Sequence, residues 1–283
     1  MKVLVTGCTG QLGFDVCRQL KEKNIEYYGA VRDDFDLRNQ AAIVSFIEKI
    51  KPDAVIHCAA YTAVDKAEDE PELCRQINVT ATRTIAEICK TINAKMLYIS
   101  TDYVFTGTGD HFQEVNDKKI AVNVYGQSKL DGESAVRNTL KNHFIVRVSW
   151  VFGIKGHNFI RTMLNLAQNH STLRVVNDQI GSPTYTADLA VLLCNMVLSN
   201  KYGTYHATNE GICSWKDFAE EIFRQAAVNT AVIGQLSAEY PTKARRPLNS
   251  RLSKKSLDDA GFRRLPDWHD ALQRYLKEIN LEK

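Results

Sequence analysis

A tyrosine and a lysine stand four residues apart in the segment from Tyr125 to Lys129. If a helix begins here, the phenol and the ammonium group lie on one helix face, about one turn apart. An ordinary tyrosine loses its proton near pH 10, and a neighbouring cation favours the phenolate, so we expect Lys129 to lower the pKa of Tyr125. A phenol tuned in this way can exchange a proton with an alcohol or a carbonyl group near neutral pH.

A third polar side chain, Thr101, directly follows the run 95–100, which we predict as a strand. Parallel sheets place ligand-binding groups at the carboxyl ends of their strands. Each feature also has a simpler explanation, because Tyr-x-x-x-Lys spacing occurs by chance in many helices and a threonine at a strand end often only caps the chain. A catalytic role for Tyr125 and Lys129 is favoured because the chain begins with a glycine-rich segment.

That opening begins with β-branched residues at 2–6, continues with three glycines spaced three apart, and then takes helical periodicity. Strand, glycine loop and helix in this order suit a dinucleotide, because the loop backbone can approach a pyrophosphate at the positive end of the helix. The spacing is G-x-x-G-x-x-G rather than G-x-G-x-x-G, and a tight turn without a ligand is the alternative. The predicted cofactor contacts in this loop are Gly7, Gly10, Gln11, Leu12 and Gly13.

A second strand is predicted at 25–31, and Arg32 follows it. An acid at this place binds the ribose hydroxyls of NAD, whereas an arginine pairs with the 2′-phosphate of NADP. Arg32 therefore favours NADPH slightly over NADH, although two aspartates follow it and a solvated surface arginine is the alternative. Asp36 and Leu37, just before the next predicted helix, are also included among the cofactor contacts.

A third strand is predicted at 54–57, followed by the small residues Cys58, Ala59 and Ala60. Small side chains allow a flat ring to lie against the backbone, so we include these three among the cofactor contacts. Ordinary close packing explains the composition equally well. A long helical pattern then runs from about 71 to 92.

Composition limits the class of protein. The chain has 283 residues, a formal net charge of +3 and no long basic run, which argues against a nucleic-acid surface. No apolar run is long enough for a signal peptide or a membrane span, so we expect a soluble, cytoplasmic protein with no membrane partner. The seven cysteines lack C-x-x-C spacing and are expected to be reduced, and the histidines show no ligand spacing that would indicate a metal.

The predicted fold class is α/β, with a doubly wound, Rossmann-type parallel sheet and a smaller C-terminal substrate-binding lobe. Helices predicted at 187–198, 214–225 and 267–279 fit the lobe. We place the NAD(P)-binding domain at 1–150 and mainly the lobe at 151–283. The boundary is approximate, because the chain can cross back in such folds.

Several blocks together resemble the dTDP-4-dehydrorhamnose reductase family of extended short-chain dehydrogenase/reductases, over nearly the whole chain. Beyond the glycine loop and Tyr125-x-x-x-Lys129, the blocks are 58–68, 100–105, 123–126, 149–152, 177–184 and 246–252. The resemblance implies an NAD(P)H-dependent reductase that acts on the 4-keto group of dTDP-4-dehydro-L-rhamnose, a step of dTDP-L-rhamnose biosynthesis for cell-wall polysaccharide.

The resemblance also implies roles for individual residues. Tyr125 would donate a proton to the keto oxygen, Lys129 would support Tyr125 and bind the nicotinamide ribose, and Thr101 would hydrogen-bond the keto oxygen. Matching positions around the nucleotide sugar are Thr62, Val64, Tyr103, Trp150, Gln179, Arg246 and Asn249. For Trp150 a core position is the alternative, and for Arg246 a solvated surface position.

Members of this family differ in magnesium use and dimer formation. The acids at the positions to compare are Asp15 and Asp188, and they do not form a convincing metal cluster. Magnesium is therefore not supported, and the chain is expected to be a monomer or a homodimer.

Two other functions stay open. One is a non-catalytic regulatory subunit, as in the relatives that bind methionine adenosyltransferase. The other is a different nucleotide-sugar reductase, an epimerase or a dehydratase, for which Asp102 offers one acid beside Thr101 but no glutamate follows.

Overall fold

A six-stranded parallel sheet forms the centre of the larger part of the molecule. The structure is a computed structural model and describes residues 1–281. Neighbouring strands all run parallel, which confirms the predicted doubly wound α/β fold. In order across the sheet the strands are β10 (Gly203–His206), β5 (His143–Val148), β4 (Lys95–Thr101), β3 (Ala54–His57), β1 (Lys2–Thr6) and β2 (Glu26–Ala30).

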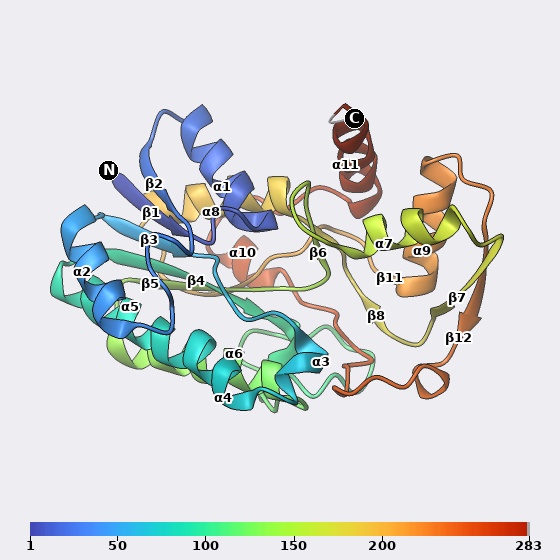
Figure 1. Ribbon diagram of the computed structural model, residues 1–283, viewed down its shortest axis with the longest axis horizontal. Helices are drawn as coiled ribbons and strands as arrows, with labels where there is room; N and C mark the ends of the chain where they lie inside the picture. The colour runs from blue at the N-terminus through green and yellow to red at the C-terminus, as the bar shows by residue number, and fades with distance from the viewer. Residues whose placement is uncertain (282–283) are drawn as a thin grey trace.

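Helices cover both faces of this sheet, and its central strands are therefore apolar on both sides. All four residues of β3 are buried, as are Val3, Leu4 and Val5 of β1. On one face lie α1 (Gln11–Glu22) and α8 (Thr186–Leu198), and on the other lie α2 (Gln40–Ile50), α5 (Ala81–Thr91) and α6 (Val124–Thr139) (Figure 1).

The strand order reverses at β1, which pairs with β2 on one side and with β3 on the other. Open α/β sheets bind ligands outside the carboxyl ends of their strands at such a switch point. The glycine loop, the turn after β3 and the end of β4 all emerge at this edge. The sheet thus collects the segments that the sequence predicts for cofactor and catalysis.

The chain returns to the sheet at α8, and this corrects one expectation. The predicted helix at 187–198 was assigned to the lobe, but α8 packs on α1 and β10 extends the sheet beside β5. The reason is its apolar face, which shares a core with β1 and α1. That core includes Leu189, Leu193, Met196, Val16 and Leu20.

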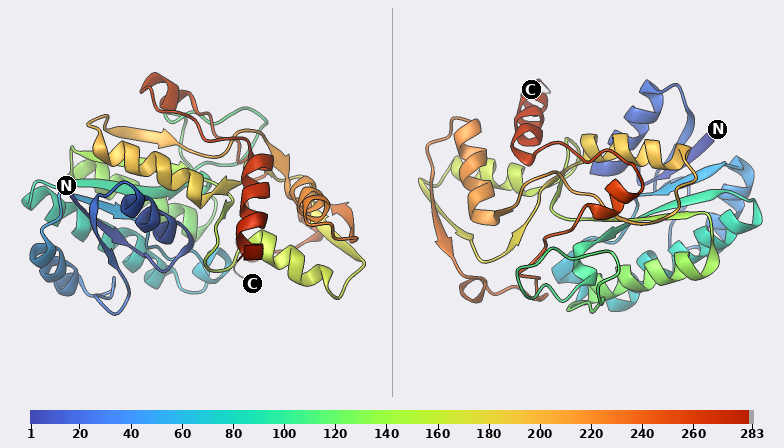
Figure 2. Two further views of the ribbon diagram at one scale, coloured as in Figure 1. Left: turned by 90° about the horizontal axis from the view of Figure 1, so that it is seen from above. Right: turned by 180° about the vertical axis from the view of Figure 1, so that it is seen from behind.

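The smaller lobe has its own apolar core, built from α7 (Phe159–Ala167), α9 (Trp215–Gln225), α11 (Trp268–Leu281) and the parallel pair β7 (Thr172–Val176) and β12 (Ala231–Gln235). Figure 2 shows these elements grouped at one end of the molecule. Two short strand pairs lie in the second half of the chain, β6 (Val151–Phe152) with β9 (Thr184–Tyr185) and β8 (Ile180–Gly181) with β11 (Cys213–Ser214).

The long helical pattern predicted at 71–92 forms α4 (Pro71–Arg75), a π-helical turn η1 (Gln76–Thr80) and α5. Such turns occur frequently at functional sites. The remaining short helices are α3 (Val64–Ala67), η2 (Asp102–Val104), η3 (Ser237–Glu239) and α10 (Lys255–Asp259). Strands β5, β10 and β12 were not predicted, nor were the two-residue strands β6, β8, β9 and β11. All seven cysteines are unpaired, as expected.

No helix within residues 1–281 is long and apolar enough to cross a membrane.

Candidate active site

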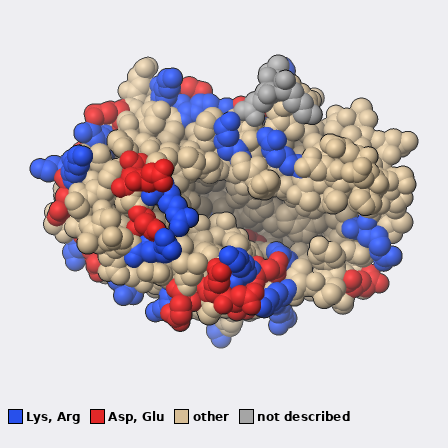
Figure 3. All heavy atoms as spheres, in the orientation of Figure 1, with Lys and Arg blue, Asp and Glu red and all other residues tan. Residues whose placement is uncertain are grey.

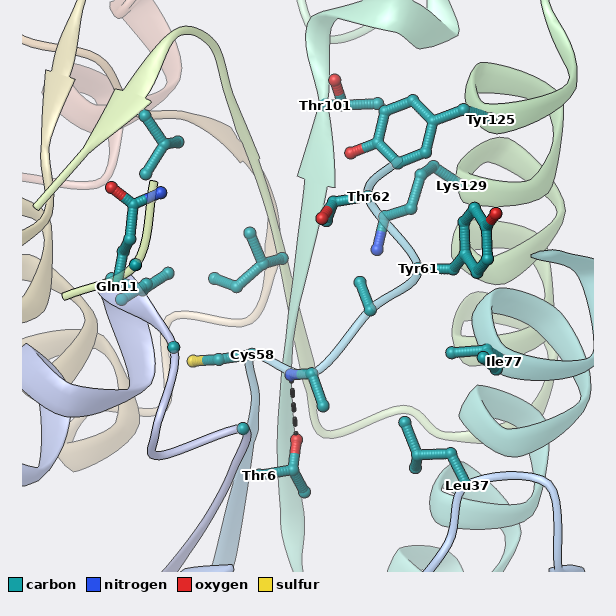
Figure 4. A pocket seen from close by; sticks show the side chains of 18 of the residues that line it. Thr6, Gln11, Leu37, Cys58, Tyr61, Thr62, Ile77, Thr101, Tyr125 and Lys129 are labelled. Carbon is teal, nitrogen blue, oxygen red and sulfur yellow. Dashed lines mark hydrogen bonds between the residues drawn. The ribbon is translucent and has the colours of Figure 1, made fainter. Parts of the chain in front are cut away.

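A cavity of about 990 Å³ lies at the carboxyl edge of the sheet, between the sheet and the lobe. Figure 3 shows the molecule hollowed between its two parts, and Figure 4 shows the side chains that line the hollow. Most of the predicted site residues face this one cavity. They are Gly7, Gly10, Gln11, Leu12, Arg32, Asp36, Leu37, Cys58, Ala59, Ala60, Thr62, Val64, Thr101, Tyr103, Tyr125, Lys129 and Trp150.

The glycine loop leaves room for a ligand along its backbone. Gly7 has a φ of +69°, and a Cβ there would lie 2.9 Å from the Cα atom of Ala59. A Cβ on Gly10 would meet only the carbonyl oxygen of Gly7, at 3.3 Å, and otherwise open space. Since α1 begins at Gln11, the loop offers a pyrophosphate an open approach to a helix N-terminus.

Gly13 differs from the other two glycines because it does not line the cavity. A Cβ on Gly13 would lie 2.2 Å from the carbonyl oxygen of Gly7. Gly13 therefore allows α1 to pack closely against the loop. Gln11 ties the loop to the second half of the chain, since its side-chain oxygen accepts hydrogen bonds from the Gly153 N–H at 2.8 Å and from Asn158 Nδ2 at 3.1 Å.

Two arginines stand at the end of the cavity near β2. Arg32 is 77% exposed and lies 3.9 Å from a carboxylate oxygen of Asp36. Arg38, which the sequence analysis missed, donates from Nε to both carboxylate oxygens of Asp36, at 3.0 and 2.9 Å. This pairing lowers the pKa of Asp36 to about 2. The carboxylate that could bind ribose hydroxyls is thus already paired, and a second cation stands beside Arg32.

The turn after β3 is fixed by two residues that the sequence analysis did not single out. The N–H of Ala59 donates to Thr6 Oγ1 at 3.2 Å, the bond drawn in Figure 4. Asn78, in the π-helical turn, accepts from the N–H of Tyr61 at 2.8 Å and donates to its carbonyl oxygen at 3.0 Å. Cys58, Ala59 and Ala60 are thereby held flat along the cavity wall.

The first turn of α6 presents Tyr125 and Lys129 on one face, opposite Thr101 at the end of β4 (Figure 4). Asn123 caps this helix, because its side-chain oxygen accepts from the N–H of Gly126 at 2.7 Å. The ring of Tyr103 packs edge-on against that of Tyr125, with centroids 5.8 Å apart. The structure thus brings the three predicted catalytic residues together.

The expectation that Lys129 lowers the pKa of Tyr125 is wrong. Burial raises the pKa of Tyr125, and the charge of Asp102 adds to this. The Lys129 ammonium group instead lies 4.1 Å from the ring centroid of Tyr98, and burial lowers its pKa to about 7 while the charge of Glu133 opposes the shift. For both side chains burial is the largest influence on the pKa.

Thr101 makes two hydrogen bonds that the sequence did not reveal. Its hydroxyl donates to Asp102 Oδ1 at 3.0 Å and accepts from the N–H of Tyr103 at 3.3 Å. The second oxygen of Asp102 accepts from the hydroxyl of Ser250. Asp102 is buried, and desolvation raises its pKa to about 6. The sequence analysis considered Asp102 only as the acid of a dehydratase, and it did not single out Ser250, because only the long-range fold brings the two together.

The substrate end of the cavity contains Trp150, which has a φ of +50°. Its indole stacks on Trp215, with centroids 3.7 Å apart and an interplanar angle of 16°. Gly181 packs against the same ring, since a Cβ there would lie 2.9 Å from Trp150 Cε2. Trp215 also lines the cavity and was missed, because the sequence gives no sign that residues 65 positions apart would stack.

Three predicted substrate residues and Gly13 do not line the cavity. Gln179 lies behind Trp215 and accepts from its indole N–H at 3.2 Å. Arg246 donates to Asp65 at 2.6 Å and to the hydroxyl of Tyr103 at 3.4 Å, so it stands next to the cavity wall. Asn249 is buried, and its side-chain nitrogen donates to the carbonyl oxygen of His111 at 2.8 Å.

The two acids considered for magnesium, Asp15 and Asp188, are each paired with an arginine. Arg18 lies 3.2 Å from Asp15 and also contacts Glu278, and Arg274 donates to both oxygens of Asp188 at 2.8 and 2.7 Å. Within residues 1–281 no group of three acids, histidines or cysteines is arranged to hold a metal ion. Two guanidinium groups already neutralise the carboxylates where a cation would bind.

Comparisons with known proteins agree over the full length. The profile of a family described as RmlD substrate binding domain matches residues 1–281. The spore coat polysaccharide biosynthesis protein SpsK of Bacillus subtilis is 41% identical over 277 residues, which cover 98% of this chain and 97% of the relative.

Two solved structures extend this similarity. A dTDP-4-dehydrorhamnose reductase from Clostridium acetobutylicum has a TM-score of 0.97 and 38% identity, over 99% of this chain and 100% of the other. A dTDP-4-dehydrorhamnose reductase from Bacillus anthracis, solved in complex with NADP, has a TM-score of 0.95 and 38% identity, over 98% and 99% of the two chains.

Proposed function

The chain belongs to the dTDP-4-dehydrorhamnose reductase family of NAD(P)H-dependent oxidoreductases, and we propose that it transfers a hydride from NADPH to the 4-keto group of dTDP-4-dehydro-L-rhamnose. One observation carries the proposal. A single cavity joins the open glycine loop to Thr101, Tyr125 and Lys129, and it continues to the tryptophan pair. The same arrangement supports a division of the chain into a cofactor domain and a substrate lobe.

NADPH, when bound, supplies the hydride. The glycine loop would hold its pyrophosphate, and Arg32 with Arg38 would face the 2′-phosphate. The turn 58–60 would lie along the cofactor ring, and Lys129 would reach the nicotinamide ribose. Asp36 is already paired with Arg38, which supports NADPH over NADH.

Tyr125 would donate the proton that converts the keto oxygen to a hydroxyl group. Its pKa is raised by burial, so the phenol carries its proton at neutral pH, as a donor must. Thr101 and Tyr125 both line the cavity, and Tyr103 packs against the ring of Tyr125. Their hydroxyl groups would meet the same oxygen of the sugar.

The nucleotide sugar would lie between these residues and the lobe. Thr62, Val64 and Tyr103 would contact it from the sheet side, and Trp150 from the lobe side. Arg246 would contact the diphosphate after leaving Asp65, because a guanidinium group binds phosphate oxygens in pairs. Gln179 and Asn249 would act by supporting Trp215 and the loop that carries Arg246.

The decisive experiment follows NADPH absorbance when the purified protein is mixed with enzymatically generated dTDP-4-dehydrorhamnose. We expect stoichiometric NADPH oxidation and a dTDP-rhamnose product, with slower turnover on NADH. A UDP-linked 4-keto sugar serves as the comparison substrate. Absence of turnover with either cofactor, while NADPH still binds, would reject the reductase and favour a non-catalytic binding subunit. Conversion of the sugar with no net change in the oxidation state of the nicotinamide would favour an epimerase.

A further inference from the structure

The proposed reaction requires Thr101 to donate a hydrogen bond to the sugar oxygen, but its hydrogen is already used. A threonine hydroxyl has one hydrogen to donate. In this structure that hydrogen is donated to Asp102 Oδ1 at 3.0 Å, and the oxygen accepts from the N–H of Tyr103 at 3.3 Å. An ionised carboxylate can only accept hydrogen bonds, so while Asp102 is charged it competes for the one Thr101 hydrogen with the sugar oxygen and with Tyr125, whose hydroxyl also bonds to Thr101.

We propose that Asp102 is a positioning residue that must carry a proton during the reaction, so that its carboxyl group donates to Thr101 Oγ1 and frees the Thr101 hydrogen for the sugar oxygen. The inference rests on the proposed function. The proton on Asp102 comes from solvent and stays on Asp102 throughout the turnover, because Asp102 donates a hydrogen bond and transfers no proton. The proton that enters the product still comes from Tyr125, so the balance of the reduction is unchanged.

The surroundings of Asp102 suit this role. Asp102 is 3% exposed, and the second oxygen of its carboxyl group accepts from the hydroxyl of Ser250, in the loop after Asn249. That bond fixes which oxygen faces Thr101. Burial raises the pKa of Asp102 to about 6, which keeps the protonated form accessible near neutral pH.

Few other ionisable groups face Asp102. Tyr103 lies on the same 3-10 turn and Tyr125 on α6, and the charge of Asp102 raises the pKa of both. From the loop at 249–252, the contact is the hydroxyl of Ser250. Lys129 titrates separately, because burial lowers its pKa to about 7. Loss of charge on Lys129 and ionisation of Asp102 both occur as pH rises, so an experiment must separate them.

The Asp102→Asn variant separates them. An asparagine amide donates to Thr101 and accepts from Ser250 at every pH, as the protonated carboxyl group does. The ratio of kcat/KM for this variant to that of the unaltered enzyme cancels the titration of Lys129. We expect the ratio to rise roughly tenfold per pH unit above the pKa of Asp102. A ratio that does not change with pH would overturn the inference, and Asp110→Asn, the same change at an exposed carboxylate, is the control.

A second variant, Ser250→Ala, tests the direction in which the pH dependence of kcat/KM shifts. The hydrogen bond from Ser250 lowers the pKa of Asp102, so Ser250→Ala raises it. Asp102 then keeps its proton to higher pH, and the fall in kcat/KM moves to higher pH in this variant. A shift to lower pH, or no shift in a folded variant, would contradict the proposed role.

A measurement without substrate keeps the inference separate from the proposed function. The carboxyl carbon of Asp102 is titrated by NMR in protein labelled with 13C-aspartate, with Asp102→Asn to assign the signal. The hydrogen bond from Thr101 lowers the pKa of Asp102, so Thr101→Val should raise it. An unchanged pKa would show that Thr101 does not donate to Asp102. A raised pKa in a protein that fails to oxidise NADPH would reject the proposed function and leave this coupling intact.

Discussion

The cofactor side and the substrate side of the cavity are built in different ways. On the cofactor side, backbone segments at the ends of adjacent parallel strands line the wall, and strand register places them. On the substrate side, loops are held by side-chain contacts between distant residues, such as Arg246 with Asp65 and Ser250 with Asp102. Changes on the first side should therefore alter cofactor affinity, and changes on the second side should alter substrate recognition.

Removal of the phenol hydroxyl at the boundary between the two sides should have the largest effect. Tyr125→Phe deletes the proposed proton donor and keeps the ring packed on Tyr103. We expect kcat to fall by about 10² to 10⁴-fold, the usual contribution of a general acid. NADPH affinity, measured by the fluorescence of the bound cofactor, should stay within about twofold. Retention of most turnover would remove Tyr125 as the donor.

Two glycine-to-alanine changes test whether the sides are separable. In Gly181→Ala the new methyl group meets Trp150 Cε2 at 2.9 Å, and overpacking of this size costs about 1–3 kcal/mol of folding free energy. The strain is relieved when the Trp150 ring moves, so KM for the nucleotide sugar should rise. In Gly10→Ala the methyl group occupies the space proposed for the pyrophosphate, and the Kd for NADPH should rise instead. Equal effects of both variants on both ligands would contradict the division.

Loss of the proposed contact between Arg32 and the 2′-phosphate should have a smaller effect, on the Kd for NADPH. Arg32→Ala should raise the Kd for NADPH by roughly five- to tenfold, at the low end for a charged hydrogen bond because Arg32 is 77% exposed. The Kd for NADH, which lacks this phosphate, should change little. Titration of both cofactors into both proteins by calorimetry measures the difference. An equal loss for the two cofactors would show that Arg32 does not face the phosphate.

The smallest effect is expected from a conservative change on the substrate side. Arg246→Lys keeps a cation near Asp65 but loses the planar fork that binds two phosphate oxygens, so KM for the nucleotide sugar should rise about threefold. Its exposed neighbour provides the matched control, Arg245→Lys, which should leave KM unchanged. Steady-state kinetics at saturating NADPH distinguish the two. Similar KM values for both variants would remove Arg246 from the diphosphate site.

Local patterns in the sequence were enough to predict which strand ends line the sheet side of the cavity, although they missed Arg38 and included Gly13, which does not line it. Strand ends of a parallel sheet converge at one edge, so Gly7, Ala59 and Thr101 could be assigned to one site from their positions after predicted strands. Strand β5 was missed although its apolar run at 144–146 is a usable signal. The four residues of β10 contain no such run, and only pairing with β5 identifies them as a strand.

The substrate side was less predictable for physical reasons. Trp215 stacks on Trp150 and Ser250 bonds to Asp102 because the fold brings distant loops together, and no local pattern records those contacts. The expectation that Lys129 lowers the pKa of Tyr125 was wrong for a related reason. The argument from spacing counted the charge of Lys129, whereas burial, which depends on the whole fold, determines the direction.

The return of α8 and β10 to the sheet also has a consequence for synthesis and folding. Ribosomes release the chain from its N-terminus, and domains generally fold as units as they emerge. Here one face of α1 and one edge of β5 lack their partners until residues 186–206 have been made, after α7 and β7 of the lobe. A nascent chain that ends at residue 150 would expose the apolar surface that α8 covers. We therefore expect the two parts to complete folding together, and a fragment of residues 1–150 to aggregate.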